Sequence, residues 1–323
     1  MTTQLIPYSK PYLTGEELCD KLISQGLDVP DKTTAAKIIE RLSYYRFKAY
    51  LFPFQNTDKR FYQGTTFEDC YQLYNFDCEL RNYLFNIIQH VEIGLRSSLD
   101  HWMVAKTNNK FWYLDSSLFV DSGQQIKTVS RIRDTFVDSK ERFALHFRTK
   151  YFNEYCPFYR ELPPSWVAIE LMTFGNLLKL MESFTQETVS ACELDKYAKK
   201  KCDTSNFHAL RSWVGSVHEL RNICGHHSRL FNRNLRSPSG IKRRLKNDIE
   251  LIRAEESHEP QLNRLYTAIA ALQIIYLKLG YSERIGHTVK DMFTRYPAAK
   301  RFRVSMGFPE RWEDETVLFG SAS

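Results

Sequence analysis

The sequence has few of the residues that interrupt helices and none of several signatures that mark common enzyme classes. Its 323 residues include only 13 glycines and 11 prolines. These gather at a few joints and leave long stretches free for regular structure. No GxSxG, GxxxxGK or HExxH pattern occurs. The absence of these patterns disfavours serine hydrolases of the α/β class, P-loop enzymes and zinc proteases.

Cysteine pairs and long apolar runs are also missing. The seven cysteines stand at irregular spacings without any CxxC, which predicts reduced thiols, a cytoplasmic location and no structural zinc. No apolar run approaches the roughly 18 residues of a membrane-spanning helix. The N-terminal MTTQLIPYSKPYLT lacks the basic start and apolar run of a signal peptide. We therefore expect no membrane association, no metal and no cofactor.

The composition is that of a globular chain with a moderate basic bias. About 43% of the residues are hydrophobic and 26% are charged, so a sizeable core can form. The formal net charge is +7. This bias is compatible with a polyanionic partner but does not establish one, because many other proteins carry as much positive charge.

Long stretches repeat apolar residues every three to four positions, which predicts an all-α fold. Thr14 and Glu17 form the pattern of a capping box at the start of the first helix. The expected helices then cover about 31–50, 67–106, 124–150, 165–184, 186–200, 206–232 and 258–279. We divide the chain into an N-terminal helical appendage (1–55), a helical body (60–285) and a C-terminal short helix with an extended tail (286–323).

One stretch, HELRNICGHHSRLFNRN, carries an unusual mixture of histidine, arginine and asparagine on the expected helix 206–232. At 100° per residue, one stripe of this helix is predicted to be buried, with His227 as a core histidine. The stripe comprises Trp213, Val217, Leu220, Cys224, His227 and Phe231. The opposite face is predicted to carry Asn222, His226, Arg229 and Arg233. Gly225 is expected to leave room beside His226, and Arg221 to reach the same group from the flank. The competing interpretation is an ordinary solvated face.

These residue types suit the metal-independent cleavage of RNA through its own 2′-hydroxyl group. An imidazole with an ordinary pKa near 6.5 can take or give a proton at neutral pH. A guanidinium binds phosphate through two donors and stabilises the charge that develops on it. The products would carry a 2′,3′-cyclic phosphate and a 5′-hydroxyl. One histidine cannot readily act as both base and acid, so two facing copies of the motif would complete the site.

The segment from Arg221 to His226, RNICGH, resembles the R-x(4–6)-H motif of HEPN ribonucleases (higher eukaryotes and prokaryotes nucleotide-binding domains). LPPSWVAIELMTFGNLLKL and LRNICGHHSRLFNR are similar to signatures of the Abi-like abortive infection proteins of bacteria, and the similarity extends over about residues 20–312. The resemblance implies a HEPN-type helical bundle, ribonuclease activity, a role in phage defence as a toxin, and a homodimer. It implies Arg221, Asn222 and His226 as catalytic residues. The tyrosine that silences some HEPN toxins is replaced here by Ser228.

A second R-x4-H spacing occurs in RSSLDH, from Arg96 to His101, on the long helix expected at 67–106. It would provide a second half-site within one chain and make a dimer unnecessary. The competing interpretation is a surface pair, in which Glu92 and Arg96 form an i,i+4 salt bridge.

A basic segment, LRSPSGIKRRLK, follows the motif. Together with Arg229 and Arg233, we expect it to contact RNA phosphates, although basic runs are as often simply solvated. Its candidate RNA-binding residues are Arg236, Lys242, Arg243 and Arg244. The aromatic run from Tyr44 to Phe54 favours packing over base stacking.

Two other functions remain open on the sequence. The chain could be a non-cleaving RNA-binding protein that holds a structured small RNA, and an antitoxin or regulatory RNA could restrain a nuclease of this kind. It could also be a helical adaptor whose motif is only a polar face, although periodicity alone does not explain the choice of residues on that face.

Overall fold

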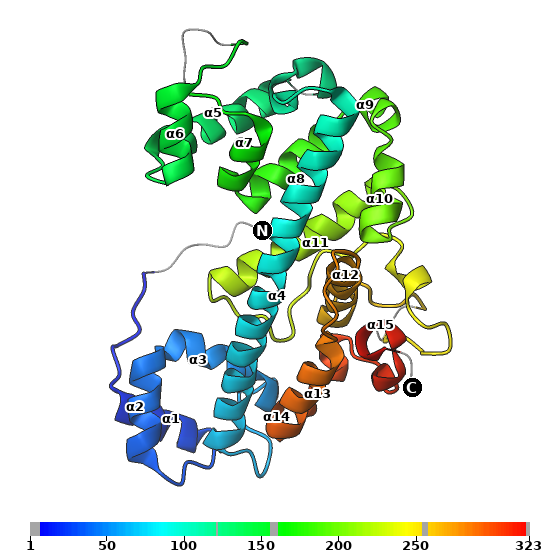
Figure 1. Cartoon of the computed structure of the whole chain (residues 1–323). Helices are drawn as coiled ribbons and strands as arrows, with labels where there is room; N and C mark the ends of the chain where they lie inside the picture. Colours follow the sequence, from blue (N-terminus) through cyan, green and yellow to red (C-terminus); the bar gives the residue numbers. More distant parts are fainter. Residues whose placement is uncertain (1–6, 121, 156–160, 254–257, 321–323) are drawn as a thin grey trace. The chain divides into compact units, whose positions relative to one another are not determined.

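The computed structural model describes residues 7–120, 122–155, 161–253 and 258–320 (Figure 1). Within these ranges the regular elements are helices, and β-pairing is limited to isolated bridges such as Gln55 with Phe61. The predicted all-α fold class is confirmed. Cys156 and the first residues of the proline-rich joint lie outside the described ranges. No helix in these ranges combines the length and the apolar composition that crossing a membrane requires.

The contacts within the chain divide it into two compact units. The first comprises residues 1–79 and 292–301, and the second comprises residues 80–291 and 302–323. The first unit is therefore larger than the appendage 1–55 outlined from the sequence, and it includes part of the C-terminal segment. Two helices, α4 and α13, contribute residues to both units.

The first unit is built from short helices around the start of α4. Its elements are α1 (Gly15–Ser24), α2 (Lys32–Leu42), α3 (Tyr44–Leu51), η1 (Phe52–Phe54), α14 (Pro297–Lys300), the start of α4 (Phe67–Thr107) and the end of α13 (Ile285–Arg295). Phe47, Tyr50 and Phe54 point into its core, with 0–3% of each exposed. The hydroxyl of the buried Tyr50 donates to Asp77 Oδ2 at 2.6 Å, so this polar group is satisfied.

The helix starts in this unit follow capping rules that can be read from the sequence. The Thr14 hydroxyl accepts the Glu17 N–H at 3.3 Å, and the Glu17 carboxylate accepts the Thr14 N–H at 2.7 Å. This reciprocal pair is the predicted capping box. The prediction of a single helix over 31–50 is wrong, because Ser43, with φ +64°, separates α2 from α3.

The helix predicted over 67–106 is confirmed as α4. Its apolar stripe is buried throughout, and each member of the stripe is at most 1% exposed. The members are Leu73, Phe76, Leu80, Leu84, Ile87, Val91 and Leu95. A stripe this regular fixes which face of α4 turns outward, and therefore fixes the side on which Glu92 and Arg96 stand.

The second unit contains most of the helices. After α4 come η2 (Trp112–Leu114), η3 (Ser116–Leu118), α5 (Ser122–Asp138), α6 (Arg142–Lys150), α7 (Ser165–Leu171), α8 (Phe174–Ser183), α9 (Gln186–Ala191), α10 (Leu194–Cys202), α11 (Phe207–Gly225), η4 (Ile241–Arg244), α12 (Leu265–Lys278), most of α13, η5 (Val304–Met306), η6 (Trp312–Asp314) and α15 (Thr316–Phe319). Short helices and 3-10 turns thus occupy the segment where an extended tail was expected.

Helix α12 forms the centre of the second unit, and α11 packs directly against it. Every residue from Leu265 to Tyr276 is buried, and α10, α11 and α15 all contact this helix. On α11, the predicted stripe of Trp213, Val217, Leu220 and Cys224 is at most 4% exposed. The opposite side of α11 is left for the polar residues of the motif.

Several helices expected as single elements are each two helices. The stretch 124–150 divides into α5 and α6, 165–184 into α7 and α8, and 186–200 into α9 and α10. The Thr173 hydroxyl accepts the Asn176 N–H at 3.2 Å and so caps the start of α8. The preceding helix, α7, ends two residues earlier at Leu171. Hydrophobic periodicity continues across such breaks because both helices cover the same core.

Candidate functional site

Helix α11 ends at Gly225, not near residue 232 as predicted. His226 is the cap residue, and His227 adopts the left-handed conformation with φ +54°. The Ser228 N–H donates to Ile223 O at 3.0 Å, and the His227 N–H donates to Cys224 O at 3.1 Å. These two bonds form a Schellman cap, which satisfies the last carbonyls of the helix. Arg229 and Arg233 therefore do not share a helical face with Asn222.

Both histidines of the cap are exposed. The prediction that His227 belongs to the buried stripe is wrong, because the chain turns at this residue before the stripe could continue. Phe231, the next member of that stripe, is buried, although it is no longer helical. The exposed ring of His226 lies at the very end of α11, where a large ligand can reach it.

The side chain of Asn222 pairs with His218 one turn earlier in α11. Its Nδ2 donates to His218 Nε2 at 3.2 Å. An amide nitrogen only donates, so the imidazole must accept on Nε2 and carry its proton on Nδ1. Burial, and then the nearby Arg221, lower the pKa of His218 below its ordinary value of 6.5. The His218 ring is therefore neutral at neutral pH and holds the Asn222 amide.

A buried carboxylate on α4 joins two arginines from two different helices. Glu92 is only 8% exposed. Its Oε1 pairs with Arg96 Nη2 on the same helix, and its Oε2 lies 3.5 Å from Nε of Arg221 on α11. A single negative charge thus faces two positive charges in a partly dehydrated setting, which leaves the cluster with a local excess of positive charge.

Arg221 runs along α11 toward its C-terminal end. Its guanidinium carbon lies 5.9 Å from the centre of the Phe85 ring, within the range of a cation–π contact. A Cβ placed on Gly225 would lie 3.3 Å from Phe85 Cε2 and 3.8 Å from Arg221 Nη1. The missing side chain at Gly225 therefore admits Phe85 and Arg221, and the open space predicted beside His226 is filled by them.

The second R-x4-H spacing contributes its arginine to this cluster, while its histidine stands apart. Arg96 shares Glu92 with Arg221. His101 is exposed, and within the described ranges no hydrogen bond, ion pair or ring contact joins it to Glu92, Arg96 or Arg221. The predicted salt bridge between Glu92 and Arg96 is present, but the cluster also extends to a second helix. Arg96 is brought to the motif, and His101 is not.

The candidate RNA-binding residues fall into two groups. Arg236 is 3.6 Å from Glu182 through Nη1 and lies across α11 at Gly215, and Arg244 pairs with Asp203. Among the described residues, the remaining four cations have no ion pair within 4 Å, although Lys242 lines a polar hollow together with Asp248 and Glu250. These four are Arg229, Arg233, Lys242 and Arg243.

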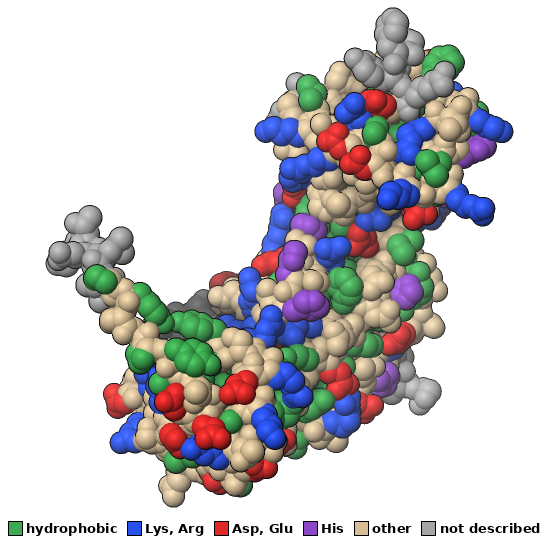
Figure 2. Space-filling view, turned by 90° about the vertical axis from the view of Figure 1, so that its left-hand side faces the viewer, with side chains coloured by type: hydrophobic (Ala, Val, Ile, Leu, Met, Phe, Trp, Pro, Cys, Tyr) green, Lys and Arg blue, Asp and Glu red, His purple; other side chains and the backbone are tan. Residues whose placement is uncertain are grey.

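The face of the molecule drawn in Figure 2 carries histidine side chains among Lys and Arg side chains near its middle. This face is the left-hand side of Figure 1, toward which the C-terminal end of α11 points. Acidic side chains are interspersed there. The arrangement offers basic and titratable groups on one accessible surface, as contact with a polyanion requires.

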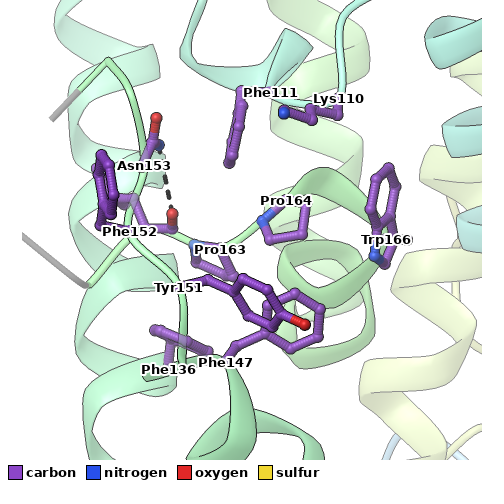
Figure 3. A pocket seen from close by; sticks show the side chains of 11 residues that line it. Lys110, Phe111, Phe136, Phe147, Tyr151, Phe152, Asn153, Pro163, Pro164 and Trp166 are labelled. Atoms are coloured by element: carbon purple, nitrogen blue, oxygen red, sulfur yellow. Dashed lines mark hydrogen bonds between the residues drawn. The ribbon is translucent and has the colours of Figure 1, made fainter. Parts of the chain in front are cut away.

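The LPPSW segment shapes an aromatic pocket of about 210 Å³, whose lining includes neither Arg96 nor Arg221. Figure 3 shows Pro163 and Pro164 between the rings of Phe111 and Tyr151, with Trp166 to one side. The hydroxyl of Tyr113 donates to Pro163 O at 2.6 Å, and Asn153 Nδ2 donates to Leu162 O at 3.3 Å. The segment is therefore anchored by its carbonyl groups and contributes rings and prolines to the pocket.

Two residues of the cluster were not selected as site residues from the sequence. His218 precedes Asn222 by four positions, so helical spacing alone could have identified it. Glu92 was noted only as the surface partner of Arg96. Its contact with Arg221 joins two helices far apart in sequence, and no periodicity within either helix reveals such a contact.

Comparison with known families places the chain in one of them. The profile of the family described as Abi-like protein matches residues 37–232, and the chain belongs to this family. The matched region begins within α2 and ends just beyond α11, so it includes Glu92, Arg221 and His226. Comparisons with the curated proteins and with the solved structures found no match.

The family assignment indicates a role in abortive infection, by which bacteria defend themselves against phage. The boundary of the match also divides the candidate RNA-binding residues. Arg229 lies inside it, whereas Arg233 and the segment around η4 lie beyond it. The motif and its arginine cluster thus belong to the region that defines the family.

Proposed function

We propose that the protein is a metal-independent endoribonuclease of the HEPN type that acts as an abortive-infection toxin. Arg221, Asn222 and His226 are its catalytic residues in this proposal. The observation that carries it is the arrangement at the end of α11, where an exposed imidazole follows directly on Gly225, beside which the Arg221 guanidinium lies. An acid–base group and a phosphate-binding cation are thereby presented together.

The reaction needs a base, an acid and a cation at the phosphate. The RNA 2′-oxygen attacks the adjacent phosphorus while a base takes its proton, and the departing 5′-oxygen receives a proton from an acid. Arg221 stabilises the negative charge that develops on the phosphate oxygens. The phosphate ends as a 2′,3′-cyclic diester, and the leaving strand begins with a 5′-hydroxyl. The atoms balance without water or metal in this step.

Glu92 and His218 support this arrangement without touching the substrate. Glu92 restrains Arg221 through Oε2 while Arg96 shares its charge, so the guanidinium keeps a net positive field toward the phosphate. His218 holds the amide of Asn222. We propose that a homodimer brings two His226 rings to one phosphate, because a single imidazole cannot begin the reaction as both base and acid.

The test is cleavage of a defined RNA by the purified chain in EDTA, with mapping of the product ends. We expect 2′,3′-cyclic phosphate and 5′-hydroxyl ends. Exchange His226→Ala should lower the rate by about 10²–10⁴-fold, the usual contribution of acid–base catalysis. Because His226 is exposed, the melting temperature should not change. Full activity of His226→Ala would remove this residue from the mechanism, and the exchange His101→Ala serves as a matched control.

A second function, a non-cleaving RNA-binding protein, is favoured by one observation. Four cations after α11, namely Arg229, Arg233, Lys242 and Arg243, have no ion pair within the described part of the chain. Such cations suit contact with the phosphates of a structured small RNA, including a regulatory or antitoxin RNA. Tight RNA binding by the wild type together with a complete lack of cleavage would favour this function over the nuclease.

A further inference from the structure

The first unit has a broad groove that the proposed nuclease chemistry does not use. An N-terminal segment of residues 7–13, which has no helix or strand, faces α1, α2 and α3 across this groove. Between this segment and the helices lies a hollow of about 1060 Å³, which shares Lys10, Lys21, Tyr44 and Lys48 with a neighbouring hollow toward Lys59. The two hollows form one continuous surface within the first unit.

Tyrosines stand along this groove with their rings in solvent. Tyr8 is 75% exposed, Tyr12 is 87% exposed and Tyr45 is 74% exposed. Tyr8 of the N-terminal segment and Tyr45 of α3 both line the larger hollow. Figure 2 shows hydrophobic side chains, among which tyrosine is counted, gathered beside the N-terminal segment at its left. Rings this exposed contribute little to the core and are free to stack on a ligand.

The aromatic residues of 44–54 therefore fall into a buried set and an exposed set. Phe47, Tyr50 and Phe54 are buried, as the packing prediction requires, whereas Tyr45 and Phe52 are exposed. The groove is lined by Tyr44, Tyr45 and Phe52. Lys48 lies over the Phe52 ring at 5.2 Å from its centre, so a cation and a ring are presented side by side.

The charge of the groove is positive. Four lysines line it, namely Lys10, Lys21, Lys48 and Lys59, and the acidic residue among its lining residues is Glu40. In the described ranges none of these lysines has an ion pair within 4 Å, whereas Glu40 accepts the Gly15 N–H at 3.1 Å. A second copy of this groove would bring like charges together, so self-association through it is disfavoured.

We infer that this groove of the first unit binds a single-stranded polynucleotide, with bases stacked on Tyr8, Tyr12 and Tyr45 and phosphates on the four lysines. Exposed aromatic rings along a basic groove are the combination that single-stranded nucleic acids require. A double helix hides its bases from such rings. RNA and DNA strands share this chemistry, and the experiment below separates them. Binding here needs no cleavage, so the inference goes beyond the proposed nuclease function.

The experiment measures fluorescence anisotropy of a labelled oligouridylate of about 20 nucleotides, longer than the span of one aromatic groove. The full chain carries His226→Ala in all cases, so that cleavage does not interfere. Tyr45→Ala is compared with Tyr62→Ala, because Tyr62 is also exposed, at 56%, in the first unit but does not line the groove. Lys48→Gln is compared with Lys37→Gln, an exposed lysine on α2 outside the groove.

We expect Tyr45→Ala to weaken binding by about 5-fold or more, the loss of one stacked base. Lys48→Gln should reduce the slope of log K against log salt by about 0.7, the release of ions from one phosphate of a single strand. Tyr62→Ala and Lys37→Gln should change neither quantity. A strand of deoxyribonucleotides that binds with the same dependence on Tyr45 would identify a surface indifferent to the 2′-hydroxyl, whereas weaker DNA binding would identify RNA as the ligand.

Three outcomes overturn the inference. The first is that groove and control variants bind the oligonucleotide equally well. The second is that a duplex binds as tightly as the single strand and is insensitive to Tyr45→Ala. The third is that the His226→Ala chain binds no oligonucleotide even at low salt. A failure of the nuclease proposal would give a different result. A wild-type chain without cleavage activity would still bind the strand through Tyr45 and Lys48.

Discussion

The arginines of the cluster at Glu92 and those of the segment after α11 differ in how they are held. Arg96 and Arg221 share one buried carboxylate, and only 15% and 36% of their side chains are exposed. Arg229 and Arg233 follow α11 outside any helix and Arg243 lies in η4, and none of the three has an ion pair in the described ranges. Both arginines of the cluster are therefore held by a buried carboxylate, whereas three arginines of the segment after α11 are left without an ion pair.

The two sets of arginines therefore suit two different tasks, which are the positioning of a charge at one phosphate and the general attraction of phosphates. A guanidinium held by Glu92 loses little freedom when a phosphate arrives, so it can act on charge that develops in one place. A free guanidinium attracts phosphates over a distance and adapts to each strand, but it fixes no geometry. Exchanges in the cluster should therefore change rate and stability, whereas exchanges in the basic segment should change affinity and its salt dependence.

Among exchanges of these arginines, the largest effect is expected for Arg221→Gln. Loss of the cation that faces the phosphate should lower the cleavage rate by about 10²–10³-fold. Arg229→Gln, which removes an unpaired arginine outside the cluster, should lower it by less than about 10-fold. Initial rates on a defined RNA in EDTA measure both. Equal losses for the two variants would show that Arg221 acts only as one more attracting charge.

Glu92→Gln tests the holding carboxylate. Without it, Arg96 and Arg221 remain close together and half-buried with no counter-charge, which should destabilise the unit by about 2 kcal/mol. This corresponds to a melting temperature lower by about 4–8 °C. The matched control is Glu193→Gln, whose carboxylate pairs with Lys106 and Lys196 while 41% exposed, and which should change stability by less than about 0.5 kcal/mol. Similar shifts in both variants would contradict the distinction between held and free charges.

Next in size is a comparison within the basic segment itself. Arg243 and Arg244 are neighbours in η4, yet Arg244 pairs with Asp203 while Arg243 has no ion pair in the described ranges. In the His226→Ala chain, Arg243→Gln should reduce the salt slope of RNA binding by about 0.7. Arg244→Gln should reduce it less, because its charge is already partly neutralised. The reverse order would mean that the Asp203 pair opens when RNA binds.

The sequence predicted the elements of this comparison better than their contacts. The long helix predicted over 67–106, the buried stripe of α11 from Trp213 to Cys224 and the capping box at Thr14 follow local rules of spacing and hydrogen bonding, and all three are present. The end of α11 was not predicted from the sequence. His227 ends the helix in the left-handed conformation, a position where glycine is the usual sequence signal. Breaks such as Ser43 were missed for a similar reason, since the hydrophobic period continues on both sides.

Contacts between helices were beyond the sequence for a different physical reason. Glu92 and Arg221 meet because α4 and α11 pack with Phe85 against Gly225. That approach depends on where the two helices lie on the core, which periodicity leaves open. The catalytic roles of Arg221, Asn222 and His226 and the RNA contacts remain predictions that the experiments above address.

The smallest expected effect is a change in the pH dependence of stability on exchange of His218. This side chain is half-buried and close to Arg221. Burial and Arg221 lower its pKa below 6.5, so the folded state takes up a proton less readily than the unfolded chain. The stability that this provides is complete above about pH 6.5 and is lost as the pH falls below that value. His218→Gln should therefore lose less melting temperature than the wild type between pH 7 and about 5.5. Exchange of the exposed His101 is the control, and equal pH dependence in wild type and His218→Gln would show that burial and Arg221 do not lower the pKa of this ring.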